Sequence, residues 1–146
     1  EISPINRGLT KYRMLIPAAV LKHAELVRTL TRRSLAAAFA DVDVIAWPTV
    51  PAVAPPLEEP MVQLPSGALP ADAANPRGAG LANLTGIPAV SLPVGFEDGM
   101  PVGLQLQGAW GSDALLLDAA EALERATERR YVDAVSPVAG GAGAPT

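Results

Sequence analysis

The stretch "NLTGIPAVSLPVGFEDGMPVGLQLQG", residues 83–108, contains two apolar segments separated by a turn signal. Apolar and other side chains alternate along Ala89–Val94 and along Val102–Gln107, a pattern typical of half-buried strands. Asp98-Gly99 lies between them and favours a tight turn. We therefore predict an antiparallel hairpin. In an ordinary core hairpin, glycine and proline are expected only at the turn, because glycine weakens a strand and proline removes a ladder donor. Here they recur throughout.

The segments on either side of the hairpin predict two helices and a third strand. Apolar residues recur at helical spacing along Ala18–Ala40 and again after Ser112, which is placed to cap a helix that runs to about Arg130. Val42–Trp47 is a short apolar run ended by a proline, which indicates a buried strand. We expect this strand and the hairpin to form one sheet, with the helix after Ser112 covering a face.

The remaining segments show no sustained period. Prolines and alanines dominate between Pro48 and Gly80, which predicts a long irregular excursion. Compact domains keep such excursions for function or where there is a surface to pack on. Residues 136–146 have little to bury, so we expect a flexible tail after a domain at residues 1–135.

Composition excludes several classes of protein. The chain has 146 residues, of which 49% are hydrophobic, and a net charge of −4 without a basic stripe, so we expect no nucleic-acid partner. It has no cysteine, so it has neither disulfides nor thiolate metal ligands. It also lacks a signal-peptide pattern and an apolar run of the ~18 residues that suggest a membrane span. We expect a cytoplasmic protein without a membrane partner.

The sequence around the residues suited to catalysis or metal binding does not favour either role. His23 is the only histidine and lies in the basic first helix, where a surface role is favoured over a Ser-His-Asp site. Ser91 lies in a strand and not on a sharp strand-to-helix turn, which favours packing or a hydrogen bond over a nucleophile. The close acidic pairs at 41/43 and 58/59 have no accompanying histidine or third carboxylate, so we expect no metal and no cofactor.

Four pieces of the sequence together resemble the C-terminal third of the amidase signature family. They are "FADVDVIAWPTVPAVAPP", "NLTGIPAVSLPVG", "DGMPVGLQLQG" and "LLLDAAEALERAT", in the family's order, and they cover most of residues 22–127. The resemblance implies an α/β fold with a large mixed sheet flanked by helices, to which this segment adds late strands and the final helix. In the family this region lies close to the catalytic core. Its glycines and prolines would then permit tight packing there.

The resemblance also implies that the catalytic residues lie outside this chain. Family members cleave amides with a serine nucleophile, a second serine in a cis peptide and a lysine base, all in a Gly/Ser-rich signature of the N-terminal half. This sequence lacks that signature, its only lysines are Lys11 and Lys22, and its six serines lie in unrelated contexts. The implied function is the C-terminal segment of an amidase whose Ser-Ser-Lys site lies upstream. Its partners would be a small-molecule amide and the missing N-terminal half.

An alternative from a different class is a non-catalytic scaffold or binding module derived from the amidase fold. An upstream reading frame with a Gly/Ser-rich signature and a lysine would favour the amidase. Both interpretations predict a soluble α/β fold. We also expect the isolated chain to be poorly stable and to associate, because a sheet cut from its parent has unpaired edges. A homo-oligomer of this chain is therefore one of the expected partners.

Four residues are candidates for the wall of a substrate pocket. Asn83 and Thr85 belong to the family-like "NLTG", where the asparagine amide can fasten irregular backbone, and a structural role is favoured over substrate contact. Thr49 follows the first strand, and for it too a structural role is favoured over substrate contact. Trp47 either lines an apolar pocket or fills the core, with the core favoured.

One departure from the family narrows the substrate. The amidase component of the tRNA-dependent amidotransferases carries an aspartate that helps bind glutamine at the place where this sequence has Pro76. Proline cannot accept the ammonium group of an amino acid, and Asp72 is the nearest acid. The resemblance therefore favours hydrolysis of another amide over glutamine-dependent transamidation.

Overall fold

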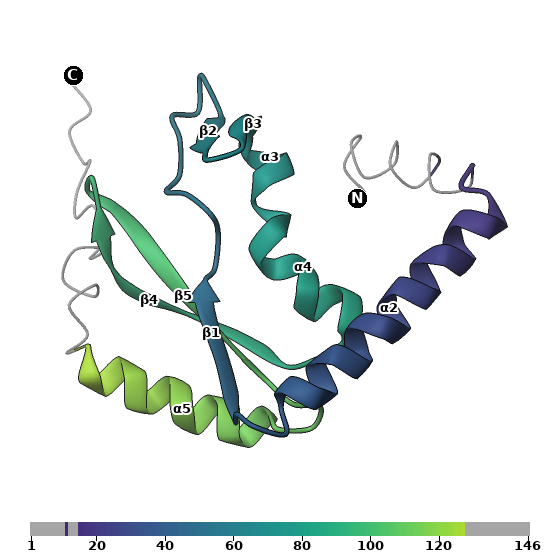
Figure 1. The fold of residues 1–146 in the computed structure, drawn as a ribbon. Helices are drawn as coiled ribbons and strands as arrows, with labels where there is room; N and C mark the ends of the chain where they lie inside the picture. Colours follow the sequence, from purple (N-terminus) through teal and green to yellow (C-terminus); the bar gives the residue numbers. More distant parts are fainter. Residues whose placement is uncertain (1–10, 12–14, 128–146) are drawn as a thin grey trace, which may run out of the picture.

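The computed structural model describes residue 11 and residues 15–127 (Figure 1). Both the predicted tail at 136–146 and the end of the last helix toward Arg130 lie outside the described residues. The helices are α2 (Ala18–Ala38), α3 (Ala71–Ala74), α4 (Pro76–Thr85) and α5 (Asp113–Ala126). The strands are β1 (Val44–Pro48), β2 (Met61–Leu64), β3 (Gly67–Pro70), β4 (Ala89–Glu97) and β5 (Met100–Gly108).

The central sheet has the order β1-β5-β4, and both pairings are antiparallel. This confirms the hairpin and its pairing with the first strand. Asp98 and Gly99 form the turn with positive φ values of 52° and 76°, as a tight hairpin turn requires. The register shifts between Pro93 and Gly95, so the proline lies where the ladder is already interrupted. The first strand was expected at 42–47, but it begins at Val44 and includes the edge proline at 48.

The α5 helix covers one face of the sheet, as its apolar stripe predicts. Leu106, Leu116 and Ala120 form the buried cluster there. The helix begins at Asp113, and Ser112 occupies the N-cap position as expected. Its side chain makes no capping hydrogen bond, because the hydroxyl donates instead to the carbonyl of Ala109 at 2.7 Å. The hydrophobic residues packed around the cluster are Val44, Val90, Leu92, Leu104, Ala119 and Leu123.

The segment between Pro48 and Gly80 is more regular than expected. It contains the β2-β3 hairpin, the short α3 and the first half of α4. These pieces share a small core of their own, in which Val62 and Ala74 are buried. The sequence gives little sign of them because four-residue elements are too short to show a period. As one consequence, "NLTG" lies in the last turn of α4 and not in irregular backbone.

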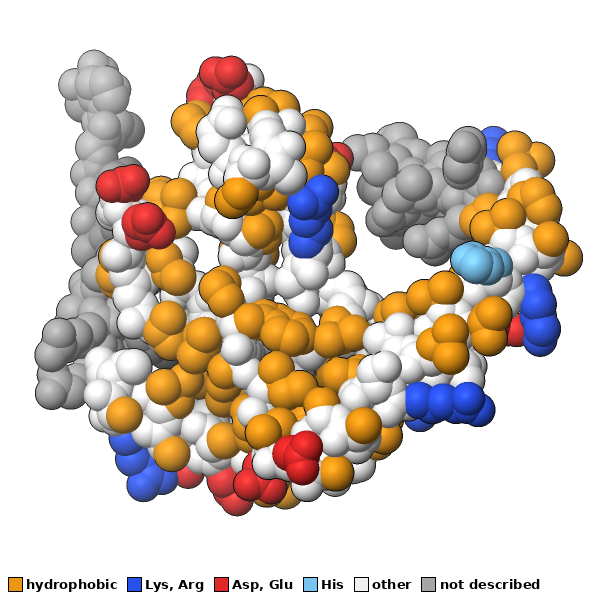
Figure 2. All heavy atoms as spheres, viewed as in Figure 1, with side chains coloured by type: hydrophobic (Ala, Val, Ile, Leu, Met, Phe, Trp, Pro, Cys, Tyr) orange, Lys and Arg blue, Asp and Glu red, His pale blue; other side chains and the backbone are white. Residues whose placement is uncertain are grey.

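The α2 helix leaves most of its apolar side chains exposed. It ends at Ala38, two residues before the predicted end, and Leu35 is its one buried residue. Figure 1 shows the helix extending away from the sheet, and Figure 2 shows hydrophobic side chains along it. A continuous exposed apolar surface of this kind is typical of a face that another element covers. Within residues 15–127, none of the helices combines the length and apolar character needed to cross a bilayer.

Candidate functional site

The face of the sheet opposite α5 carries a chain of hydrogen bonds. Side chains alternate along β5, so Gln105 and Gln107 point away from the leucines that contact α5. The indole Nε1 of Trp47 donates to Oε1 of Gln105 at 3.1 Å, and Nε2 of Gln107 donates to the same oxygen at 2.5 Å. The two glutamines are 6% and 0% exposed. The buried chain therefore fixes the position of the Trp47 ring.

A pair of hydroxyl groups lies next to this chain, above Gly103. Oγ1 of Thr49 and Oγ of Ser91 are 2.5 Å apart. A Cβ atom at residue 103 would lie 2.9 Å from the threonine oxygen and 3.2 Å from the serine oxygen. Glycine in this strand therefore leaves room for the two hydroxyls. The pairing matches the hydrogen-bonding role expected of Ser91, whose partner is a hydroxyl and not a base.

The N-terminal half of α4 approaches the end of β1 closely. A Cβ atom built on Gly78 would lie 2.3 Å from the carbonyl oxygen of Thr49 and 3.2 Å from that of Pro48. Real Cβ atoms do not come so near to backbone, so only glycine fits here. An open pocket of about 370 Å³ lies between the helix and the strand. It is lined by Trp47, Pro48, Pro51, Arg77, Gly78 and Leu81.

The four residues named from sequence do not converge on one site. Trp47 lines the pocket, and the Thr49 backbone contacts the helix that forms the opposite wall. Asn83 is exposed on α4. Thr85 is 1% exposed, and its hydroxyl donates to the carbonyl of Leu81 at 2.7 Å.

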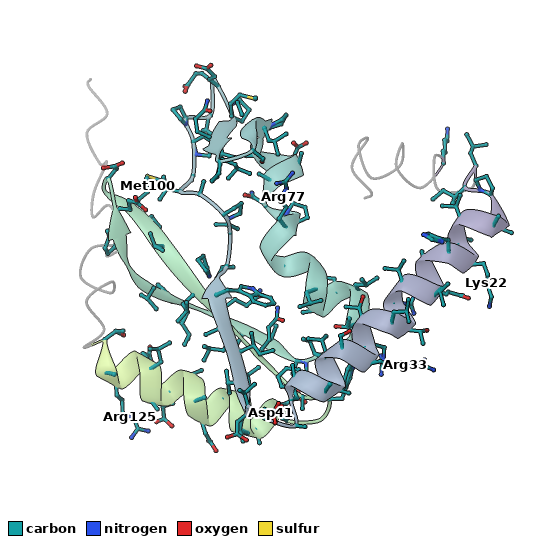
Figure 3. The ribbon with its side chains drawn as sticks, viewed as in Figure 1. Lys22, Arg33, Asp41, Arg77, Met100 and Arg125 are labelled. Atoms are coloured by element: carbon teal, nitrogen blue, oxygen red, sulfur yellow. The ribbon has the colours of Figure 1, made fainter. Side chains whose placement is uncertain are left out.

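Sequence reasoning missed three of the residues that shape this region. Gln105 and Gln107 had a usable signal, since two polar residues at alternate positions opposite leucines mark the other face of a strand. Arg77 lacked one, because its segment shows no period from which a helix face could be assigned. In Figure 3, Arg77 is seen at the start of α4. Across residue 11 and residues 15–127, no three histidine or acidic side chains gather in a way that could hold a metal ion.

A cluster around the carbonyl group of Thr85 joins three parts of the fold. The guanidinium Nη1 of Arg32, on α2, donates to this oxygen at 2.7 Å. The indole Nε1 of Trp110, between β5 and α5, donates to it at 3.0 Å. The guanidinium carbon also lies 4.5 Å from the centre of the Trp110 ring, within cation–π distance. This cluster therefore fixes the C-terminal end of α4, whose other end lines the pocket.

We expect Arg32→Ala to destabilise the chain by about 1–3 kcal/mol, because it removes a charged hydrogen bond and a cation–π contact. The urea midpoint measures this loss. Arg28→Ala is the matched control, because it removes the same charge from an exposed position one turn earlier on α2. Equal shifts of the two midpoints would contradict the role assigned to Arg32.

Taken together, the sheet, the α5 helix on one face of it and the pocket between α4 and β1 define part of a mixed α/β domain. The model of the Amidase family matches residues 4–117. The chain thus belongs to the amidase signature family, as its motifs indicated.

This chain matches only a limited part of the length of its curated relatives. The A subunit of the glutamyl-tRNA(Gln) amidotransferase of Moorella thermoacetica is 42% identical over 109 residues, which cover 70% of this chain and 20% of the relative. Its counterpart from Chloroflexus aggregans is 38% identical over 116 residues, 75% of this chain and 22% of the relative. The chain therefore spans about a fifth of the length of these relatives.

Solved structures confirm the fold class. A crystal structure of an amidase matches 86% of this chain and 29% of its own, with a TM-score of 0.77 and 32% identity. The A subunit of the glutamyl-tRNA(Gln) amidotransferase of Thermotoga maritima matches 83% of this chain and 26% of its own, with a TM-score of 0.61 and 27% identity. The described residues thus form a partial domain of the amidase signature fold.

Proposed function

We propose that this chain is the C-terminal segment of an amidase that hydrolyses a carboxylic amide to an acid and ammonia or an amine. The observation that carries the proposal is the pocket between β1 and α4, one wall of which is Trp47 held in place by Gln105. A pocket of this volume, largely apolar with a few polar groups, suits a small organic substrate. The segment contributes the sheet and this wall to a Ser-Ser-Lys site located upstream.

The chemistry of amide hydrolysis supports this division of roles. A serine nucleophile needs a neighbouring base to take its proton and donors to stabilise the oxyanion. Ser91, on β4, is hydrogen-bonded to the hydroxyl of Thr49 and not to a base. Trp47 would contact the substrate, Thr49 would support the wall, and Thr85 would position α4 through the Arg32 and Trp110 contacts. Asn83, exposed on α4, would lie at the outer margin of the site.

The test compares the isolated chain with a chimera. The isolated chain, offered aliphatic and aromatic amides, is expected to show no turnover and no labelling by a fluorophosphonate. In the chimera, residues 18–127 replace the matching segment of an active amidase signature enzyme. We expect the chimera to hydrolyse amides, unlike the isolated chain. Trp47→Ala in the chimera should lower kcat/KM by about tenfold or more, as loss of a half-buried aromatic wall implies. Leu57→Ala, at a position 93% exposed, should not.

Two results would overturn the proposal. Turnover by the isolated chain that disappears in Ser91→Ala would place the nucleophile in this segment. A folded chimera that hydrolyses no amide would instead favour the non-catalytic scaffold or binding module.

A further inference from the structure

Among the described residues that line the pocket of Trp47, Arg77 is the one that carries a charge. The other lining residues are a tryptophan, two prolines, a glycine and a leucine. Arg77 comes from the first turn of α4, next to the glycine that brings this helix against β1. Its position in the fold is therefore fixed by the same close approach that forms the pocket.

The guanidinium group of Arg77 is available to a ligand. Its side chain is exposed, and it makes no ion pair with any acidic residue within the described part of the chain. Asp72, on the preceding α3, is likewise outside both ion pairs found there. The indole N–H of Trp47 is already bonded to Gln105, so the tryptophan offers the ligand its ring and not a donor. The pocket thus presents an apolar surface with one cationic end.

We propose that this pocket selects amides whose apolar body carries a carboxylate at the end remote from the scissile bond. The carboxylate binds Arg77, and the apolar body packs against Trp47 and Leu81. A guanidinium binds a carboxylate through two parallel hydrogen bonds, which gives both strength and direction. The pocket is open and Arg77 is exposed, so the two-point geometry, more than exclusion of water, would give this contact its selectivity. This inference rests on the proposed function, because it names the substrate class of that site.

The experiment uses three para-substituted benzamides of nearly equal size. They are 4-carbamoylbenzoate, 4-methylbenzamide and 4-(aminomethyl)benzamide, which carry a negative, a neutral and a positive end. Their binding to the full 146-residue chain is followed by calorimetry and by the indole N–H resonance of Trp47. We expect the anionic amide to bind about tenfold more tightly than the neutral one, as a charge-assisted bidentate contact implies. The cationic amide should bind most weakly.

Charge variants at one position separate recognition from a structural role. Arg77→Gln should abolish the preference for the anionic amide, whereas Arg28→Gln, which removes the same charge from α2, should keep it. Arg77→Glu should reverse the order, so that the aminomethyl compound binds best. A merely structural arginine would not produce this reversal.

Three results would overturn the inference: equal binding of the three amides, binding of none of them, or a preference that persists in Arg77→Gln. The binding assay requires no turnover, so its failure is distinct from that of the proposed function. An inactive chimera with the charge preference intact would reject the amidase role alone. An active chimera whose kcat/KM does not distinguish the three amides would reject the anionic substrate class alone.

Discussion

Leu116→Ala is expected to destabilise the chain by about 2–5 kcal/mol, the cost of a leucine truncated in a packed core. Leu116 is 2% exposed and lies in the cluster that joins α5 to the sheet, with Leu106 and Ala120. Alanine would lose the apolar contacts and leave a cavity, because the strands around it cannot collapse inward without breaking their ladder. A small domain is stable by only about 5–15 kcal/mol, so the loss is a large fraction of the total.

Urea unfolding followed by circular dichroism measures this effect. The control is Leu117→Ala on the same turn of α5, since Leu117 is 62% exposed. We expect its midpoint to stay near that of the unchanged chain, because an exposed leucine gives up little on truncation. Similar midpoints for both variants would mean that α5 does not pack on the sheet as described.

Local patterns were sufficient to predict the part of the fold around this core. The alternation along residues 89–107 and the stripe on α5 each repeat over several turns or strand pairs, so the buried face is encoded within the segment itself. The recurrence of glycine in the hairpin has a specific cause at Gly103, where the absence of a side chain admits the hydroxyls of Thr49 and Ser91. No local pattern carries that information, because it depends on a residue 54 positions away and on the sheet register.

The site was harder to predict than the fold for the same reason. Trp47 was named as a residue that either lines a pocket or fills the core, with the core favoured, and the structure has it half-buried at the pocket. Arg77 and Gly78 acquire their roles only when α4 contacts β1, and their segment shows no helical period. Asn83 and Thr85 were recognised as a motif, yet the environment assigned to them was wrong, because a helix of alanine, glycine and small polar residues lacks an apolar stripe.

Gly78→Ala is expected to destabilise the chain by about 1–3 kcal/mol, the usual cost of inserting a methyl group where there is no room. The new Cβ would lie 2.3 Å from the carbonyl oxygen of Thr49. A backbone oxygen cannot rotate away as a long side chain does, so α4 must shift from β1. The same shift changes the distance between Arg77 and Trp47. The variant should therefore lose most of the preference for 4-carbamoylbenzoate, as well as stability.

Gly80→Ala is a control in the same helix, only two residues further along. A Cβ atom there meets nothing within 4 Å, and alanine is favoured over glycine in a helix by about 0.5–1 kcal/mol. We expect this variant to be slightly more stable than the unchanged chain and to keep the full ligand preference. If Gly78→Ala lowers stability and Gly80→Ala raises it, helix propensity cannot be the cause, because it favours both substitutions equally. If both variants change stability in the same direction, α4 and β1 are not in backbone contact. The pocket between them would then not form as described.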